Sequence, residues 1–178
     1  MADTITITDD RTGKTVTVPI EGGVFPSSAL RELDPSLYMY DPAYLSTASC
    51  KSAITYLDGE AGILRYGGYP IEQLAEHSSY LEVAYLLLSG ELPTASQQAE
   101  FSDSILHHTM INETLLRFFN GFHFNAHPMA MVSGVVGSMS AFYHDSMDLK
   151  NPEHREIFAH RIIAKIPTIS AAAYKHSV

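Results

Sequence analysis

Polar and β-branched apolar residues alternate over two short stretches at the start of the chain. Thr4–Thr8 alternates threonine with isoleucine, and Thr15–Ile20 alternates again through two valines. The polar sequence DDRTGK lies between them, with Gly13 available for a turn. Period-two alternation on both sides of a glycine-containing turn predicts a β-hairpin. Up to Tyr44 the periodicity weakens, which indicates connecting chain with one short helix near Ser28–Glu32.

A second strand pair is predicted around residue 60. SAITYL, which begins at Ser52, and ILRY, which begins at Ile63, are strand-like and are separated by DGEAG. A turn of this length usually needs one residue with positive φ, and we expect the Asp58–Gly59 pair to supply it.

From Pro70 onward the apolar spacing becomes helical. Two capping boxes, at Ser79–Glu82 and Thr94–Gln97, predict helix starts, and Gly90 predicts the end of the intervening helix. Residues 80–89 are apolar on nearly every side, so we expect that helix to be buried all round.

The remaining sequence predicts further helices separated by helix-breaking residues. They cover ETLLRFF, the stretch from Pro128 to Asp145, the stretch from Pro152 to Lys165, and TISAAAYKH after a break at Pro167. Six or seven helices and a front hairpin predict a mainly α fold, divided into a small β-rich region over residues 1–45 and a multi-helical region over residues 46–178.

Composition and charge exclude several classes of protein. A net charge of −9 argues against nucleic-acid binding, which needs clustered lysine and arginine. Apolar runs are too short for a membrane span, and the N-terminus resembles neither a secretory nor a transit signal. The single cysteine, Cys50, allows no internal disulfide and is expected to be buried and inert. We therefore expect a cytoplasmic protein.

The residues do not form a catalytic or metal-binding pattern. The nine histidines do not share one helix face at ligand spacing, and no GxSxG or phosphate-binding glycine motif occurs. We expect no catalytic, cofactor-binding or metal-ligating residue in this chain. The helix after Pro128 does carry small residues at near-turn spacing. These small residues are Ser133, Gly134, Gly137, Ser138 and Ala141. They could form either a ridge for close packing inside the protein or a subunit interface.

Several motifs resemble the citrate synthase family. ITYLDGEAGILRYGGYPIEQLAE and SSYLEVAYLLLSGELPT match two of its characteristic stretches, and HHTM, RFFNGF, NAHPMAM, SAFYHDS and RIIAKIPTISAAAYK follow in the family's order. The similarity covers residues 46–178. It implies the helical large domain of the bacterial type, here its N-terminal portion, because the family's histidine-bearing motifs such as GPLHGG do not occur in the sequence.

The resemblance implies an acyltransferase that condenses acetyl-CoA with oxaloacetate to citrate and CoA in the tricarboxylic acid cycle. In the family an aspartate and two histidines carry out the reaction. Because their motifs do not occur here, we expect this chain alone to be inactive and to need the rest of the enzyme. We expect a homodimer, or a hexamer built as a trimer of dimers.

The resemblance also implies an allosteric NADH site. Six residues match positions that contribute to it in NADH-inhibited citrate synthases: His108, Thr109, Met110, Tyr143, Arg161 and Lys165. Arg161 and Lys165 lie four apart and could both face a phosphate. Alternatively, they are ordinary surface cations near a helix C-terminus. His107, where the inhibited enzymes commonly have a basic residue, and Gly67, where the family usually has arginine, are departures.

Two other functions stay open at this point. One is 2-methylcitrate synthase, which uses propionyl-CoA on the same scaffold. The other is a stand-alone, non-catalytic helical module that dimerises through its small-residue helix.

Overall fold

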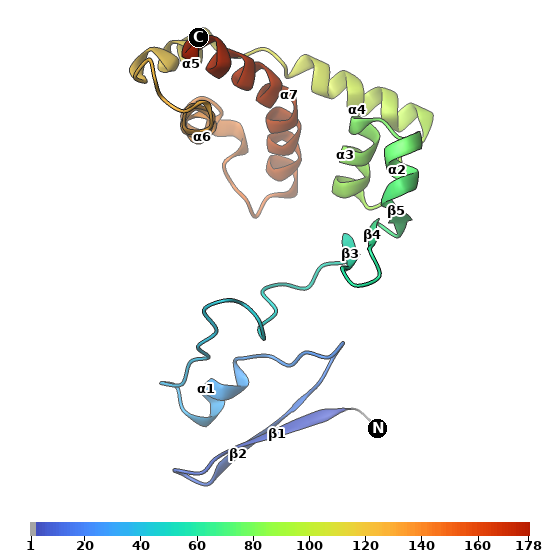
Figure 1. Cartoon of the computed structure of the whole chain (residues 1–178), viewed down its shortest axis with the longest axis vertical. Coiled ribbons are helices and arrows are strands. Elements are labelled where there is room, and N and C mark those ends of the chain that lie inside the picture. The colour runs from blue at the N-terminus through green and yellow to red at the C-terminus, as the bar shows by residue number, and fades with distance from the viewer. Residues whose placement is uncertain (1–2) are drawn as a thin grey trace. The chain divides into compact units, whose positions relative to one another are not determined.

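The structure is a computed structural model that describes residues 3–178. It divides into two compact units between Ala53 and Ile54 (Figure 1). About half of the chain is helical, and the strands form two small sheets. The predicted mainly α fold class with a β-hairpin at the front is confirmed. Among residues 3–178, no helix is both long enough and apolar enough to cross a bilayer.

The first unit is built on the predicted hairpin. Strands β1 (Thr4–Asp9) and β2 (Lys14–Pro19) pair antiparallel, with Ile7 opposite Val16. Helix α1 (Ala29–Leu33) packs against this pair and buries Ala29 and Leu33. The alternation fixes the register, because a slip by one residue would turn the apolar side chains to solvent.

Charged side chains tie the hairpin turn to α1. The Asp9 carboxylate accepts two hydrogen bonds from the Arg11 guanidinium, and Arg11 also reaches Asp34 beyond α1. The hydrogen bond from Arg11 lowers the pKa of Asp9 to about 2. The Lys14 ammonium donates to the carbonyls of Glu32 and Leu33, the last residues of α1. A cation at a helix C-terminus satisfies carbonyls that have no partner within the helix.

Residues 34–53 form turns and bends without helix or strand. Cys50 lies in this segment and is exposed, so the expectation of a buried thiol was wrong. The reason is local: the residues on both sides of it are exposed as well, and the segment builds no core that could cover the sulfur.

The second unit opens with three short antiparallel strands, β3 (Thr55–Asp58), β4 (Ile63–Tyr66) and β5 (Tyr69–Pro70). The positive φ in the first turn lies at Gly62 (69°), not at Gly59 as expected. The Asp58 carboxylate accepts hydrogen bonds from the amides of Glu60 and Ala61. This side-chain interaction holds the start of the turn, so the left-handed residue falls at its end.

Three helices follow: α2 (Ile71–His77), α3 (Tyr80–Ser89) and α4 (Ala95–His107). The predicted starts of α3 and α4 and the end of α3 are confirmed, whereas α4, expected to run through Met110, ends three residues earlier. Both capping boxes form, and Gly90 adopts the left-handed conformation after α3. The expectation that α3 is buried all round was wrong. Leu86 is buried, but Leu88 is half exposed, because α3 packs on α4 along one side.

The rest of the chain forms the main core. Its helical elements are α5 (Glu113–Arg117), η1 (Phe118–Gly121), α6 (Pro128–Ser138), η2 (Met139–Ala141), η3 (His144–Ser146) and α7 (Pro152–Ser177). The helix predicted over 128–145 therefore ends earlier, in two 3₁₀ turns. Side chains from α5, α6 and α7 meet in one cluster, which includes Leu115, Met131 and Ile169. A second cluster joins α4 to α7 through Phe101, Ile105 and Ala164.

Helix α7 contributes to both clusters, and it runs without a break through Pro167. The predicted end of the helix at this proline was wrong. A proline removes one hydrogen bond and favours a bend, and Figure 1 shows α7 bending part-way along its length. Burial of Ala164 before the proline and of Ile169 and Ala173 after it keeps both halves in place.

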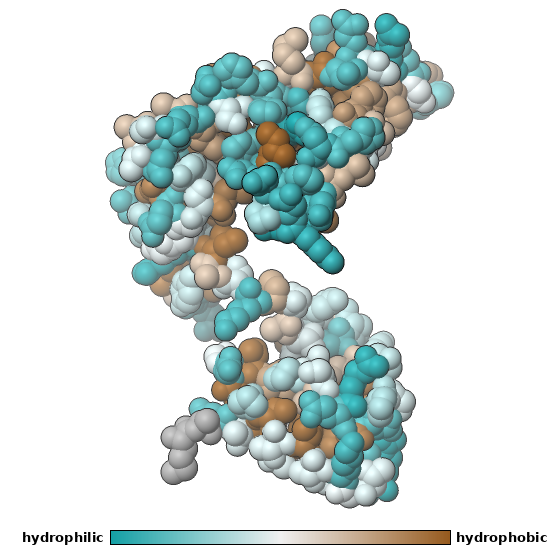
Figure 2. Space-filling view, turned by 180° about the vertical axis from the view of Figure 1, so that it is seen from behind, coloured by the Kyte–Doolittle hydropathy of each residue, from teal (hydrophilic) through white to brown (hydrophobic). Residues whose placement is uncertain are grey.

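Large hydrophobic side chains also reach the surface in both units. Brown patches interrupt the polar surface in Figure 2. Among the most exposed are Tyr40, Leu45, Met110 and Phe124, each more than 70% accessible.

Candidate functional site

Two cations on α7, Arg161 and Lys165, point into the protein. Lys165 is only 3% exposed, and the Arg161 side chain is 11% exposed. Buried cations need hydrogen-bonding partners, because losing water costs several kcal/mol per ion. The alternative that these are ordinary surface cations is therefore wrong.

Lys165 finds its partners at the end of α4. Its ammonium donates hydrogen bonds to the main-chain carbonyls of His108 (2.5 Å) and Met110 (2.6 Å). His108 directly follows α4 as its C-cap, so these carbonyls lie where the helix no longer supplies amide donors. Burial lowers the pKa of Lys165, and the positive charge of Arg161 lowers it further.

Arg161 binds the 3₁₀ turn η3. Its two terminal nitrogens donate to the two carboxylate oxygens of Asp145 at 2.6 and 2.7 Å, and one of them also donates to the Ser146 hydroxyl at 2.9 Å. The hydrogen bonds from Arg161 lower the pKa of Asp145 to about 2. This is the bidentate geometry that makes arginine–carboxylate pairs strong and directional.

The ring of Tyr143 adjoins both cations. The guanidinium carbon of Arg161 lies 4.9 Å from the ring centroid, and the Lys165 nitrogen lies 5.2 Å from it. Both distances are within the range of cation–π attraction. Burial raises the pKa of the Tyr143 hydroxyl.

The structure therefore brings five of the six predicted residues together. Tyr143, Arg161 and Lys165 take part with their side chains, and His108 and Met110 take part with their main-chain carbonyls. The side chains of residues 108–110 point elsewhere. The His108 imidazole is hydrogen-bonded to the main-chain carbonyl of Ser104, and the Thr109 hydroxyl donates to the main-chain carbonyl of Leu106. The Met110 side chain is 81% exposed. We call the group formed by Lys165, Arg161, Tyr143, Asp145 and the 108–110 main chain the α7 cation cluster.

Sequence reasoning missed Asp145. Its signal was present in SAFYHDS, two residues after Tyr143, but an acidic residue in a short turn is usually solvated. Only the approach of α7 to η3 shows that this carboxylate neutralises Arg161.

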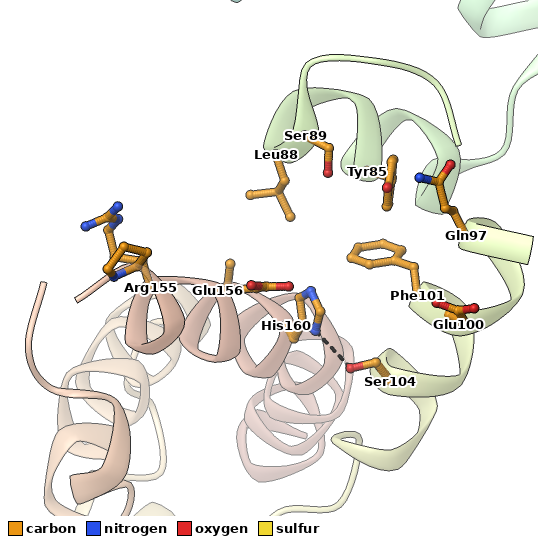
Figure 3. A pocket seen from close by; sticks show the side chains of 12 residues that line it. Tyr85, Leu88, Ser89, Gln97, Glu100, Phe101, Ser104, Arg155, Glu156 and His160 are labelled. Carbon is orange, nitrogen blue, oxygen red and sulfur yellow. Dashed lines mark hydrogen bonds between the residues drawn. The ribbon is translucent and has the colours of Figure 1, made fainter. Parts of the chain in front are cut away.

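A separate pocket of about 660 Å³ lies between α3, α4 and the first half of α7 (Figure 3). Phe101 contacts both Tyr85 and His160 edge to face at its centre. A nitrogen of His160 hydrogen-bonds to the Ser104 hydroxyl at 2.8 Å, and burial lowers the pKa of His160. Within residues 3–178, groups of three or more His, Cys, Asp or Glu side chains that could hold a metal ion do not occur.

The small residues of α6 face two ways. A Cβ on Gly134 would lie 3.0 Å from the ring of Phe122, so this glycine permits close internal packing. A Cβ on Gly137 would meet nothing within 4 Å, and Ser133 is exposed. The internal ridge therefore accounts for Gly134, whereas one exposed edge of the helix is left for a subunit contact.

Comparison with known proteins agrees with this architecture. The family model described as citrate synthase, C-terminal domain, matches residues 43–178, which is most of the chain. The chain belongs to the citrate synthase family.

Solved citrate synthases have the same fold over most of this chain. The enzyme from Pyrobaculum aerophilum is 27% identical with a TM-score of 0.66, and the match covers 78% of this chain and 38% of that one. The enzyme from Thermotoga maritima is 29% identical with a TM-score of 0.63, covering 78% and 35%.

A third structure carries ligands. Citrate synthase from the archaeon Thermoplasma acidophilum, solved as a ternary complex with carboxymethyl coenzyme A and oxaloacetate, is 25% identical with a TM-score of 0.67. The match covers 74% of this chain and 34% of that one. The chain thus spans between a third and two fifths of the length of the citrate synthases that it matches.

Proposed function

We propose that this chain forms part of a citrate synthase that condenses acetyl-CoA with oxaloacetate to give citrate and CoA. The supporting observation is the family match over residues 43–178, together with the shared helical fold. One similar enzyme binds a coenzyme A analogue and oxaloacetate, the two substrate classes of this reaction. Residues 1–178 serve as scaffold in this proposal, and the catalytic aspartate and histidines belong to the remainder of the enzyme.

The test is an assay of the full-length protein with acetyl-CoA and oxaloacetate, monitored by release of the free CoA thiol. We expect turnover with acetyl-CoA to exceed turnover with propionyl-CoA; the reverse preference would favour 2-methylcitrate synthase. The chain of 178 residues assayed alone is expected to release no thiol. Thiol release by this chain alone would show that it contains its own catalytic groups.

We also propose that the enzyme self-associates, with the exposed edge of α6 in the interface. A glycine and a serine on that edge would allow a second helix to approach closely. Sedimentation of the Gly137→Arg variant tests this idea, with Lys175→Glu as an exposed charge-changing control on α7. We expect the arginine to shift the protein toward smaller species. An unchanged distribution would remove α6 from the interface.

A second proposed function is allosteric binding of NADH at the α7 cation cluster. Two inward-pointing cations beside an aromatic ring support it, because such a site can take a phosphate and stack a planar ring. NADH binding is measured by the fluorescence of the dinucleotide on the full-length protein. We expect Arg161→Gln to weaken binding, whereas Arg155→Gln, an exposed arginine on the same helix, leaves it unchanged.

A further inference from the structure

The pairing of Arg161 with Asp145 occupies the donors that an anionic ligand would need. Both terminal nitrogens of the guanidinium donate to this one carboxylate, at 2.6 and 2.7 Å. The same planar fork of donors fits a carboxylate and a phosphate equally well. In this arrangement a ligand phosphate and Asp145 cannot both take the two nitrogens.

The two partners differ in their freedom to move. The Arg161 side chain is 11% exposed, lies against the Tyr143 ring and donates to the Ser146 hydroxyl as well. The Asp145 side chain is 65% exposed, so it can turn into water and recover hydration there. The carboxylate is therefore the partner that can leave.

Lys165 does not have the same freedom. It is buried, and its ammonium is bonded to two main-chain carbonyls at the end of α4. Withdrawing it would leave those carbonyls without a donor, which costs more than exchanging one anion for another. The ligand contact thus falls to Arg161, and Lys165 acts as a positioning residue that fixes the 108–110 segment against α7.

We propose that Asp145 is a displaceable internal counter-ion. Its carboxylate occupies the guanidinium of Arg161 until the phosphate of a ligand replaces it. This inference rests on the proposed effector site and describes its regulation. Exchange of one anion for another leaves the buried guanidinium neutralised throughout. Because Asp145 competes for Arg161, the apparent affinity for the ligand equals the intrinsic affinity multiplied by the fraction of molecules in which Arg161 is not paired with Asp145.

The experiment compares the Asp145→Asn variant with the wild-type full-length protein. The two probes are NADH, followed by fluorescence, and inorganic pyrophosphate, followed by the shift in melting temperature at constant ionic strength. Removing the competing charge is expected to tighten binding by about tenfold, which is within the range usual for coupled equilibria. Asp148→Asn, which removes a nearby carboxylate that does not contact Arg161, is expected to change affinity by less than about twofold.

The Asp145→Glu variant keeps the charge and is expected to retain the weaker wild-type affinity, which separates competition from damage to η3. Wild-type binding of NADH with no gain in Asp145→Asn would overturn the counter-ion role while leaving the effector site in place. Tighter pyrophosphate binding by Asp145→Asn without NADH binding would support the counter-ion role and reject NADH as the effector. No response of either protein to either probe would overturn both.

Discussion

The ammonium of Lys165, in the middle of α7, donates a hydrogen bond of 2.6 Å to the main-chain carbonyl of Met110, 55 residues earlier. A second bond from the same nitrogen reaches the carbonyl of His108. The two bonds attach the segment after α4 to α7, beside the residues that we propose for effector binding.

Replacing Lys165 by methionine should lower the free energy of unfolding by about 1–3 kcal/mol, because the carbonyls of His108 and Met110 lose their donor while the apolar stem is kept. Urea unfolding of the protein measures the change. Lys175→Met, on the exposed last turn of the same helix, is the control and should change stability by less than about 0.5 kcal/mol. Equal effects of the two substitutions would contradict the buried role of Lys165.

Gly67→Ala is expected to be strongly destabilising. Gly67 has φ 56°, and a Cβ there would lie 3.0 Å from the Cδ1 atom of Leu86. Left-handed backbone costs a residue other than glycine about 1–2 kcal/mol, and the contact with Leu86 adds to that cost. Alanine substitutions at two other glycines, measured by thermal denaturation, separate the cost of the left-handed backbone from the cost of the contact with Leu86. Gly68→Ala has positive φ but open space and should cost about 1–2 kcal/mol; Gly59→Ala has neither and should cost less than about 0.5 kcal/mol.

The main core of the second unit depends on Met131. Its side chain is fully buried at the centre of the cluster formed by α5, α6 and α7. Met131→Ala should cost about 2–5 kcal/mol, since it removes buried contacts and leaves a cavity. Met129→Ala, on the same helix but 62% exposed, should cost less than about 0.5 kcal/mol in the same urea titration. A small decrease in the free energy of unfolding of Met131→Ala would mean that neighbouring side chains repack to fill the cavity.

His160 should make stability depend on pH. Burial lowers its folded-state pKa below the ordinary value of 6.5, with a further decrease from His108 and an opposing effect of Glu156. The unfolded chain therefore takes up the proton first as the pH falls. The contribution of His160 is fully present above about pH 6.5 and declines below that value, until the pH has fallen through the lowered folded-state pKa.

Urea unfolding between pH 8 and pH 5 tests this sign. His160→Gln cannot take up the proton, so its stability should fall less steeply with acid than that of the wild type. Parallel curves for the two proteins would assign the pH dependence to other groups. His77→Gln is a suitable control, because the side chain of this histidine is 72% exposed.

Much of the fold was predictable because its determinants are local. The alternation in Thr4–Thr8 and Thr15–Ile20 predicted the hairpin, and two capping boxes and Gly90 predicted the starts of α3 and α4 and the end of α3. Caps and turns are contacts between residues a few positions apart, so the sequence contains both partners. The motifs over residues 46–178 also indicated the family, and the family match over residues 43–178 confirms it.

The sequence by itself determined these elements, their order and the family, because the elements depend on neighbouring residues and the family is indicated by sequence motifs. It did not determine which helix faces are covered or which charges meet. Pro167 did not end α7, and α3 exposes Leu88, because packing between distant segments outweighs local preference. The pairing of Asp145 with Arg161 depends on the approach of α7 to η3, and Lys165 is buried because it reaches the residues after α4. Only the tertiary structure decided these contacts, since their partners lie 16 to 57 residues apart.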